Sequence, residues 1–291
     1  MVSLDQLAAL DLLLWLTGSA RAARLERTNQ STIVRRSQAV EACFGVEIRR
    51  EPSGWHLAGD RQLLQMERHL HQQARLLGHR PLRLHAPFWT QKTRLRRLPQ
   101  GWCVNPATAS AVCENPVELL RARVIDAVLL TPTQMPQPSD DLACVDIYRS
   151  RIELSVFASP ETSDPLLSCR KHMDQGDLVL RQPSFLPESC LRRCREWFAA
   201  LPVPQAARAP DTGRRSQTTA LSVAFLTPEM QQVQGLPCVV DPTVEPRPYV
   251  ERLLMRRDLA GAAPLLRLQE HLSRLCGSSG DSNADRPLRA A

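Results

Sequence analysis

Residues 18–46 constrain the fold more than any other part of the chain, because they predict two short helices joined by a tight polar turn. The first helix is expected from about Ala20 to Arg27. The second is expected to open at Thr28-Asn29, residue types that accept hydrogen bonds from the unpaired amides at a helix start. Gly45 is expected to end this second helix, because glycine readily adopts the conformation of a helix C-cap. The pattern is typical of a helix-turn-helix.

The second helix of this pair has an apolar face and a polar face. Ile33, Val40 and Phe44 recur at a spacing that packs inward. On the other face, Gln, Ser and Thr can hydrogen-bond base edges, and Arg can bind guanine or phosphate. A two-helix corner inside an enzyme, with a solvated arginine face, is the alternative. The favoured interpretation is a recognition helix for double-stranded DNA, with these contact residues: Gln30, Ser31, Thr32, Arg35 and Arg36.

A short β-hairpin is predicted directly after the helix pair. Residues 46–59 alternate apolar and polar side chains and turn at Pro52-Ser53-Gly54. Arg49 and Arg50 lie beside this turn and are candidate phosphate contacts. A hairpin in this place is the wing of a winged helix-turn-helix, and it favours the DNA-binding interpretation.

The next segment, residues 60–78, predicts one unbroken helix. Leu63, Leu70 and Leu77 recur every seven residues along it. A narrow heptad seam on a polar helix is typical of pairing with another helix, often from a second subunit. We therefore expect a homodimer or homotetramer; a helix docked on its own domain is the alternative.

From Pro81 onward the pattern changes to strands alternating with helices, which favours an α/β sheet with crossover helices. The small, polar residues after 276 predict a disordered tail. The expected organisation is a winged helix-turn-helix domain, a linker or dimerisation helix, an α/β domain and the tail, at residues 1–59, 60–79, 80–276 and 277–291.

The N-terminal segment resembles a signal peptide only in part. Leu7–Leu16 is apolar, but no Lys or Arg precedes it, and Asp5 and Asp11 interrupt it. Its spacing predicts an amphipathic first helix. No run is long enough to span a membrane, so we expect a cytoplasmic protein. The formal net charge of +7 suits a polyanionic partner.

Nothing in the sequence nominates an enzyme, a metal site or a cofactor. Nine cysteines without a C-x-x-C pair predict reduced thiols, and no nucleotide-binding or hydrolase motif is present. Three histidines on or near the linker helix are expected at its surface: His69, His71 and His79. A basic run is interpreted as a solvated helix face, with a phosphate contact or an anionic-ligand funnel as alternatives: Arg80, Arg83, Lys92, Arg94, Arg96 and Arg97.

The residues of the helix pair resemble those of LysR-type transcriptional regulators. The family's helix-turn-helix carries a Gly-Ser, an Ala-Ala, a Gln that opens the recognition helix, a Glu and a closing Gly. Ala58-Gly59 resembles the start of the family's linker helix, and three later segments, 119–130, 147–159 and 221–229, resemble parts of its effector domain. The corresponding positions in the helix pair are Gly18-Ser19, Ala22-Ala23, Gln30, Glu41 and Gly45.

This resemblance implies a two-lobed α/β effector domain similar to type 2 periplasmic binding proteins. In such a domain, ligands bind where helix N-termini meet a crevice. Polar residues at predicted helix starts and strand ends are therefore candidates to bind a small polar or anionic effector: Thr90, Gln91, Asn115, Thr131, Ser184 and Ser189.

The chain also departs from the family pattern. One residue is missing between Ser19 and Ala22, Val34 replaces a usual serine on the recognition helix, and Arg49 stands where an aromatic residue anchors the wing. These changes alter the DNA-contacting face. The leading hypothesis is a DNA-binding transcriptional regulator that senses a small-molecule effector. A LysR-like protein without specific DNA binding and a secreted solute-binding protein are the alternatives.

Overall fold

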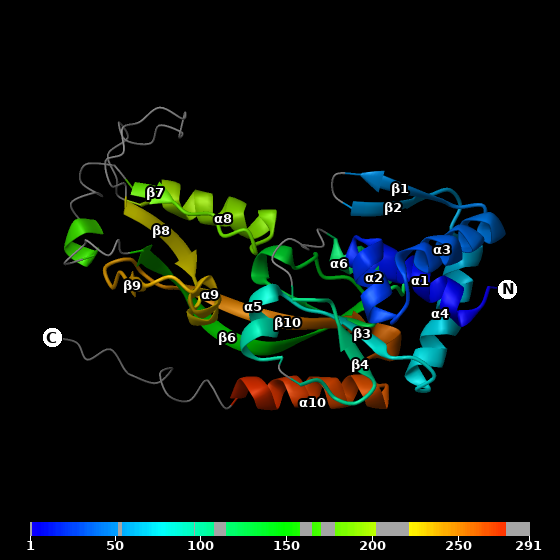
Figure 1. The fold of residues 1–291 in the computed structure, drawn as a ribbon. Coiled ribbons are helices and arrows are strands. Elements are labelled where there is room, and N and C mark those ends of the chain that lie inside the picture. The colour runs from blue at the N-terminus through cyan, green and yellow to red at the C-terminus, as the bar shows by residue number, and fades with distance from the viewer. Residues whose placement is uncertain are drawn as a thin grey trace. The chain divides into compact units, whose positions relative to one another are not determined.

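The chain forms two compact units in a computed structural model (Figure 1). The first unit comprises Met1–Leu130, Met135–Tyr148 and Glu251–Ala291, and the second comprises Thr131–Gln134 and Arg149–Val250. The predicted tail after residue 277 lies outside the described residues. The structure describes residues 2–51, 54–95, 97–107, 115–157, 165–169, 178–201 and 221–277.

The N-terminal elements confirm the predicted winged helix-turn-helix. The Asn29 side chain accepts a hydrogen bond from the Thr32 amide at 2.8 Å and caps the second helix of the pair. Gly45 ends that helix in the left-handed conformation, with a φ of 63°. The elements are α1 (Leu4–Leu16), α2 (Ser19–Leu25), α3 (Gln30–Phe44), β1 (Glu47–Glu51) and β2 (Gly54–Ala58), with β1 and β2 antiparallel.

The prediction that α1 is amphipathic is wrong, because every residue from Leu7 to Leu16 is buried. One side of α1 packs against α3 and the wing, where Leu10 and Val40 share a cluster. Another side packs against the α/β part of the first unit, where Trp15 and Leu120 share a second cluster. A helix that is surrounded by other elements has no side in contact with water, so apolar residues occur all around it.

Helix α4 (Gln62–Leu76) confirms the predicted helix after the wing. Unlike an ordinary surface helix, it buries polar side chains and exposes leucines. Its buried face combines Leu64 with polar side chains, Arg68, Gln72 and Arg75 among them. Its leucine seam faces outward, where Leu63, Leu70 and Leu77 are 67%, 58% and 76% exposed. His71 is also buried, so its predicted place at the surface is wrong; His69 and His79 are exposed.

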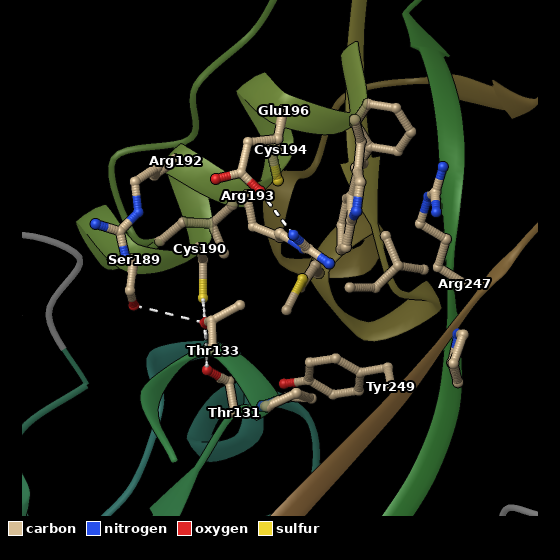
Figure 2. A pocket seen from close by; sticks show the side chains of 17 residues that line it. Thr131, Thr133, Ser189, Cys190, Arg192, Arg193, Cys194, Glu196, Arg247 and Tyr249 are labelled. Atoms are coloured by element: carbon tan, nitrogen blue, oxygen red, sulfur yellow. Dashed lines mark hydrogen bonds and ion pairs between the residues drawn. The ribbon is translucent and has the colours of Figure 1, made fainter. Parts of the chain in front are cut away.

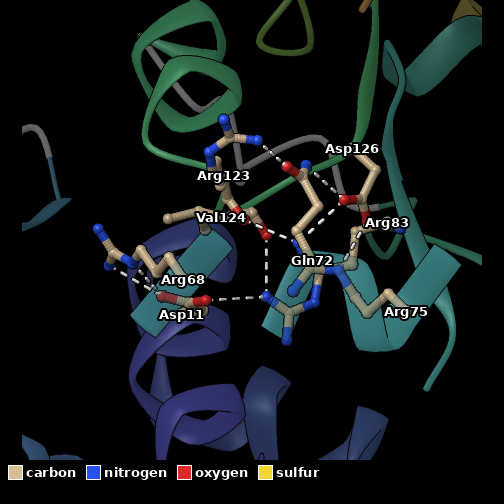
Figure 3. A network of polar contacts seen from close by, with 8 residues as sticks. All are labelled: Asp11, Arg68, Gln72, Arg75, Arg83, Arg123, Val124 and Asp126. Atoms are coloured by element: carbon tan, nitrogen blue, oxygen red, sulfur yellow. Dashed lines mark hydrogen bonds and ion pairs between the residues drawn. The ribbon is translucent and has the colours of Figure 1, made fainter. Parts of the chain in front are cut away.

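Two buried carboxylates explain why α4 buries polar side chains (Figure 3). Asp11 of α1 accepts a hydrogen bond from Arg68 Nε at 2.9 Å and lies 3.4 Å from Arg83 Nη1. Asp126 accepts hydrogen bonds from Gln72 Nε2 and from Arg75 Nε and Nη2, each at 2.9 Å. Buried charges are tolerated only when they are paired and hydrogen-bonded, so α4 must turn these polar side chains inward.

The rest of the first unit is an α/β layer. Strand β3 (Leu82–His85) has β4 (Trp102–Val104) and β5 (Ala127–Leu130) as parallel neighbours. Strand β10 (Arg247–Arg256) pairs antiparallel with β5 through its later residues. The short helices are α5 (Phe88–Thr93), α6 (Pro116–Arg121) and η3 (Arg257–Leu259), and α10 (Ala263–Gly277) is the last described element.

The second unit is also α/β. Strand β6 (Leu142–Phe157) begins in the first unit and continues here as a single strand of 16 residues. Cys194 of α8 and Phe225 of β8 lie in this unit's core cluster. The other elements are η1 (Pro132–Gln134), β7 (Leu178–Leu180), α8 (Glu188–Ala199), β8 (Leu221–Leu226), α9 (Pro228–Gln234) and β9 (Cys238–Val240). Strand β8 pairs antiparallel with β6 and parallel with β7, and β9 pairs antiparallel with β6.

The predicted fold class, an α/β protein with an N-terminal winged helix-turn-helix, a following helix and two lobes, is confirmed. The predicted domain boundaries at residues 59, 79 and 276 stay predictions. No helix within the described residues is long and apolar enough to cross a membrane.

The interpretation of the basic run as a solvated helix face is wrong for two of its members. Arg83 and Arg94 are 6% and 9% exposed. Arg83 donates to the Val124 carbonyl at 2.8 Å, and Arg94 Nη1 lies 3.8 Å from the Glu251 carboxylate. Both side chains are buried because they pair with carboxylates that lie far away along the chain. The local sequence shows that these residues are charged, but it does not show these partners. Arg96 lies outside the described residues.

We predict that Asp126→Asn lowers the free energy of unfolding by about 3–5 kcal/mol, because the buried Arg75 guanidinium loses its counter-charge. Urea denaturation measures this loss. Asp141→Asn is the control, because it removes one member of an exposed ion pair with Arg121, and we expect it to cost less than about 1 kcal/mol. Equal, small losses in both variants would contradict a structural role for the buried pair.

Candidate functional site

The predicted DNA-contacting residues of α3 lie on one side of its first two turns. Gln30, Ser31 and Arg35 are exposed, whereas Thr32 and Arg36 are half-buried. The residues that fix the helix in the domain are on the other side, where Ile33, Ser37 and Val40 are buried. The apolar face therefore packs as predicted and leaves the polar face open to solvent.

Hydrogen bonds fix the start of α3. Asn29 Oδ1 accepts from the Ser31 hydroxyl at 2.9 Å as well as from the Thr32 amide. The Ser19 hydroxyl of α2 donates to Gln30 Oε1 at 3.3 Å. The Ser19–Gln30 bond links α2 to α3, and it leaves the NH2 group of the Gln30 amide available to a base edge.

The two arginines of α3 that are predicted to contact DNA differ in their surroundings. Arg36 Nη2 lies 3.1 Å from Asp5 Oδ2 of α1, so its charge is partly neutralised within the domain. Arg35 is exposed and forms no ion pair with any described residue. Arg35 therefore presents the more available positive charge to a phosphate or a guanine.

The wing carries the other two predicted contacts. Arg49 pairs with Glu47 of the same strand at 2.7 Å, and its hydrogen bond lowers the pKa of that carboxyl. The Arg50 guanidinium lies over the Trp55 ring, 5.9 Å from the ring centroid. Both arginines are exposed. Exposed charges of this kind can exchange a local partner for a phosphate at small cost.

Two of the predicted effector residues, Thr90 and Gln91, form hydrogen bonds within the first unit. The Thr90 hydroxyl lies 2.9 Å from each oxygen of the buried Glu251 carboxylate, which also accepts from Trp89 Nε1 at 2.8 Å. Gln91 donates to the Ala86 carbonyl at 2.8 Å. Asn115 begins α6 without a side-chain cap, and Ser184, in the second unit, is exposed.

Thr131 and Ser189 are brought together in a pocket of about 500 Å³ in the second unit (Figure 2). A cavity of this size is ordinary for a small-molecule site. Beside them, the Cys190 thiol lies 2.9 Å from the Thr133 hydroxyl and 3.5 Å from the Thr131 hydroxyl. Burial raises the pKa of this thiol, which keeps it protonated and able to donate.

The sequence did not identify most of the side chains that give this pocket its character. Its aromatic members are Trp197, Phe225 and Tyr249, and its charged members are Arg192, Arg193, Glu196 and Arg247. Arg192, Arg193 and Glu196 follow Ser189 on α8, so helical spacing is a signal that could have grouped them with it. Arg247 and Tyr249 lie two residues apart on β10, so alternation along a strand could have placed these two on one face.

Two free cysteines, four residues apart on α8, contribute thiols to this pocket. Cys190 and Cys194 both line it, and both are buried. Within the part of the chain that the structure describes, no group of three or more His, Cys, Asp or Glu residues could hold a metal ion.

Comparisons with models of known protein families and with curated proteins find no match for this chain. Solved structures with a similar fold include a LysR family transcriptional regulator at 14% identity, with 94% of this chain and 99% of that chain covered and a TM-score of 0.46. HypT from Salmonella typhimurium, a hypochlorite-specific LysR-type regulator, has 17% identity, coverage of 96% and 100%, and a TM-score of 0.43. LysG from Corynebacterium glutamicum, solved with bound effector Arg, has 14% identity, coverage of 94% and 98%, and a TM-score of 0.42.

The contacts of Thr90 give a prediction about stability. Thr90→Val removes a hydroxyl donor from the buried Glu251 carboxylate and should lower the free energy of unfolding by about 1.5–3 kcal/mol. Thr93→Val on the same helix is the control, because it removes a bond to a neutral carbonyl, for which we expect about 0.5–1.5 kcal/mol. Urea denaturation compares them. An unchanged Thr90→Val variant would show that Trp89 and Arg94 suffice to hold the carboxylate.

Proposed function

We propose that this protein is a DNA-binding transcriptional regulator of the LysR type, with α3 as the helix that enters the major groove. The observation that carries the proposal is the first turn of α3, capped by Asn29 with Gln30, Ser31 and Arg35 exposed beside it. Amide, hydroxyl and guanidinium groups on one exposed face supply both base-edge and phosphate contacts. The residues of the helix pair that resemble the family support the same assignment.

The wing and the preceding helix extend the proposed interface. Arg49 and Arg50 on the wing are exposed, as are Arg24 and Arg27 beside the turn between α2 and α3. Exposed arginines around a recognition helix favour phosphate contacts that position it on the duplex. Thr32 and Arg36 are half-buried. We therefore propose that they contact DNA only after a small rearrangement of their side chains.

A second candidate function is a LysR-like protein that does not recognise a specific DNA sequence. The observation in its favour is that Val34 is 41% exposed on α3 while Arg36 pairs with Asp5. Both features reduce the number of specific contacts, while the exposed arginines would still bind phosphates. Selection of binding sites from a random duplex pool separates the two candidates: specific recognition enriches one motif, and phosphate binding alone enriches none.

We further propose that α4 joins two copies of the chain. Its outward face carries Leu63, Met66, Leu70 and Leu77, each more than half exposed. An apolar stripe on a helix whose polar side chains are buried is most simply covered by the same stripe of a second copy, in a two-fold symmetric contact. Such a dimer presents two recognition helices to two half-sites.

The pocket of the second unit is the proposed effector site, with Thr131 and Ser189 as hydroxyl groups that bind the ligand. Effector binding there would favour one arrangement of the protein over another, and thereby change DNA affinity. Thr90, Gln91 and Asn115 remain predicted effector residues of the first unit. A solute-binding protein is the alternative that shares such a pocket, and DNA binding by the full chain separates it from the regulator.

Arg35→Ala should weaken DNA binding because it removes the exposed guanidinium of α3. If Arg35 contacts a phosphate, the slope of the logarithm of the binding constant against the logarithm of the salt concentration should fall in magnitude by about one. If it contacts a guanine, specificity at one base position should relax, and binding should weaken by about 1–3 kcal/mol. Fluorescence anisotropy on duplexes from the selection measures both. Arg267→Ala on α10 is the charge-matched control, and equal affinity of the two variants would remove Arg35 from the interface.

Leu70→Glu should split the dimer, because it places a charge in the centre of the apolar seam. Gln65→Glu adds the same charge at another exposed position of α4 and should leave the dimer intact. Sedimentation velocity of the wild type and the two variants gives the oligomeric states. A Leu70→Glu dimer of wild-type stability, or a monomeric wild type, would contradict the proposed interface.

A further inference from the structure

We infer that the pocket of the second unit binds an aryl carboxylate, a small anion with a flat aromatic body. This inference rests on the proposed effector site and adds the chemical class of its ligand. It follows from three features of the lining: aromatic rings, an excess of arginine and a buried group of neutral donors.

The aromatic feature is centred on Trp197. Its ring meets the Phe225 ring edge-on, with the centroids 5.5 Å apart and the planes at 68°. Tyr249 is 2% exposed and lines the same pocket beside Ile152 and Met230. These side chains make one wall of the pocket aromatic and apolar, which suits the body of an aromatic ligand.

The charged feature is an excess of arginine over carboxylate. Arg192, Arg193 and Arg247 line the pocket together with one carboxylate, Glu196, which pairs with Arg193 at 2.7 Å. Arg192 and Arg247 form no ion pair with any described residue. The lining is therefore positively charged and favours an anion.

Two of these guanidinium groups are held close to the aromatic wall. The Arg193 and Arg247 guanidinium carbons lie 5.7 Å and 5.2 Å from the Trp197 ring centroid. Figure 2 shows Arg193 reaching into the pocket, with Arg247 on the side opposite Arg192. A carboxylate attached directly to an aromatic ring would meet a guanidinium while its ring stacks on the aromatic wall.

The neutral donors and acceptors lie at the other end of the pocket. The hydroxyls of Thr131 and Thr133 and the thiol of Cys190 form one hydrogen-bonded group, next to Ser189. Hydroxyl groups can donate to or accept from a polar substituent. This end of the pocket therefore selects among aryl carboxylates by a second polar group on the ring.

Isothermal titration calorimetry of the full chain with defined probes tests the inference. Benzoate and 1-naphthoate are the aryl carboxylates, benzamide and 1-naphthamide are their neutral counterparts, and acetate lacks the ring. We expect each aryl carboxylate to bind about tenfold or more tightly than its amide, because a hydrogen bond to a charged group is stronger than one to a neutral group. Acetate should bind more weakly than benzoate, because it cannot stack.

Variants assign the binding to this pocket. Arg193→Gln combined with Arg247→Gln should weaken aryl carboxylate binding about tenfold or more. Glu196→Gln should strengthen it, because the repelling carboxylate is removed and Arg193 is released. Arg195→Gln is the matched control: Arg195 lies on the same helix but pairs with Glu188 outside the pocket lining. All four substituted positions carry exposed side chains, so thermal melting should show folded variants.

Three results overturn the inference: no binding of either aryl carboxylate to the wild type, equal affinity for the amides, or unchanged affinity in the double variant. Fluorescence anisotropy with duplex DNA, measured in parallel, tests the proposed function independently of the ligand class. DNA binding without carboxylate binding contradicts only the ligand class. Carboxylate binding without DNA binding contradicts the regulator and leaves the pocket assignment intact.

Discussion

Two buried aspartates set the arrangement of the first unit. Asp11 is 1% exposed and Asp126 is fully buried, and the guanidinium groups around them come from α4 and β3. An uncompensated charge in such a place is strongly destabilising, so α4 must direct Arg68 and Arg75 inward. A helix that turns its polar side inward has to turn its leucines outward. The buried pairs thus determine both how α4 docks and which apolar side chains it leaves exposed.

The same unit joins the proposed recognition helix, α3, to an α/β sheet through one continuous core. Ile33 of α3 shares a cluster with Leu12 of α1 and Val128 of β5. Trp15 of α1 donates to His85 Nδ1 of β3 at 3.2 Å, and burial lowers the pKa of that histidine to about 4, so it stays a neutral acceptor. Close packing of this kind transmits displacements instead of absorbing them. Helix α1 is thus the physical link between α3 and the sheet.

The second unit has a different chemical character. Its pocket gathers arginines of α8 and β10 around an aromatic wall, and the hydroxyls of Thr131 and Ser189 lie in the same lining. In the proposed ligand site, the exposed arginines would attract an anion, and the hydroxyl and thiol groups would select its substituents. The proposed ligand class follows from these two roles.

The sequence by itself determined the local elements, because their causes are local. Periodicity gave α3 and α4, Asn29 and Gly45 gave the two ends of α3, and alternation of side chains gave the β1–β2 hairpin. Only the tertiary structure decided what each polar residue does, because its partner lies far along the chain. Thr90 meets Glu251 across 161 residues, and Asp11 meets Arg68 across 57. Residue spacing fixes which side chains share a face. Whether that face is buried, and against which charge, depends on packing between elements that the spacing does not encode.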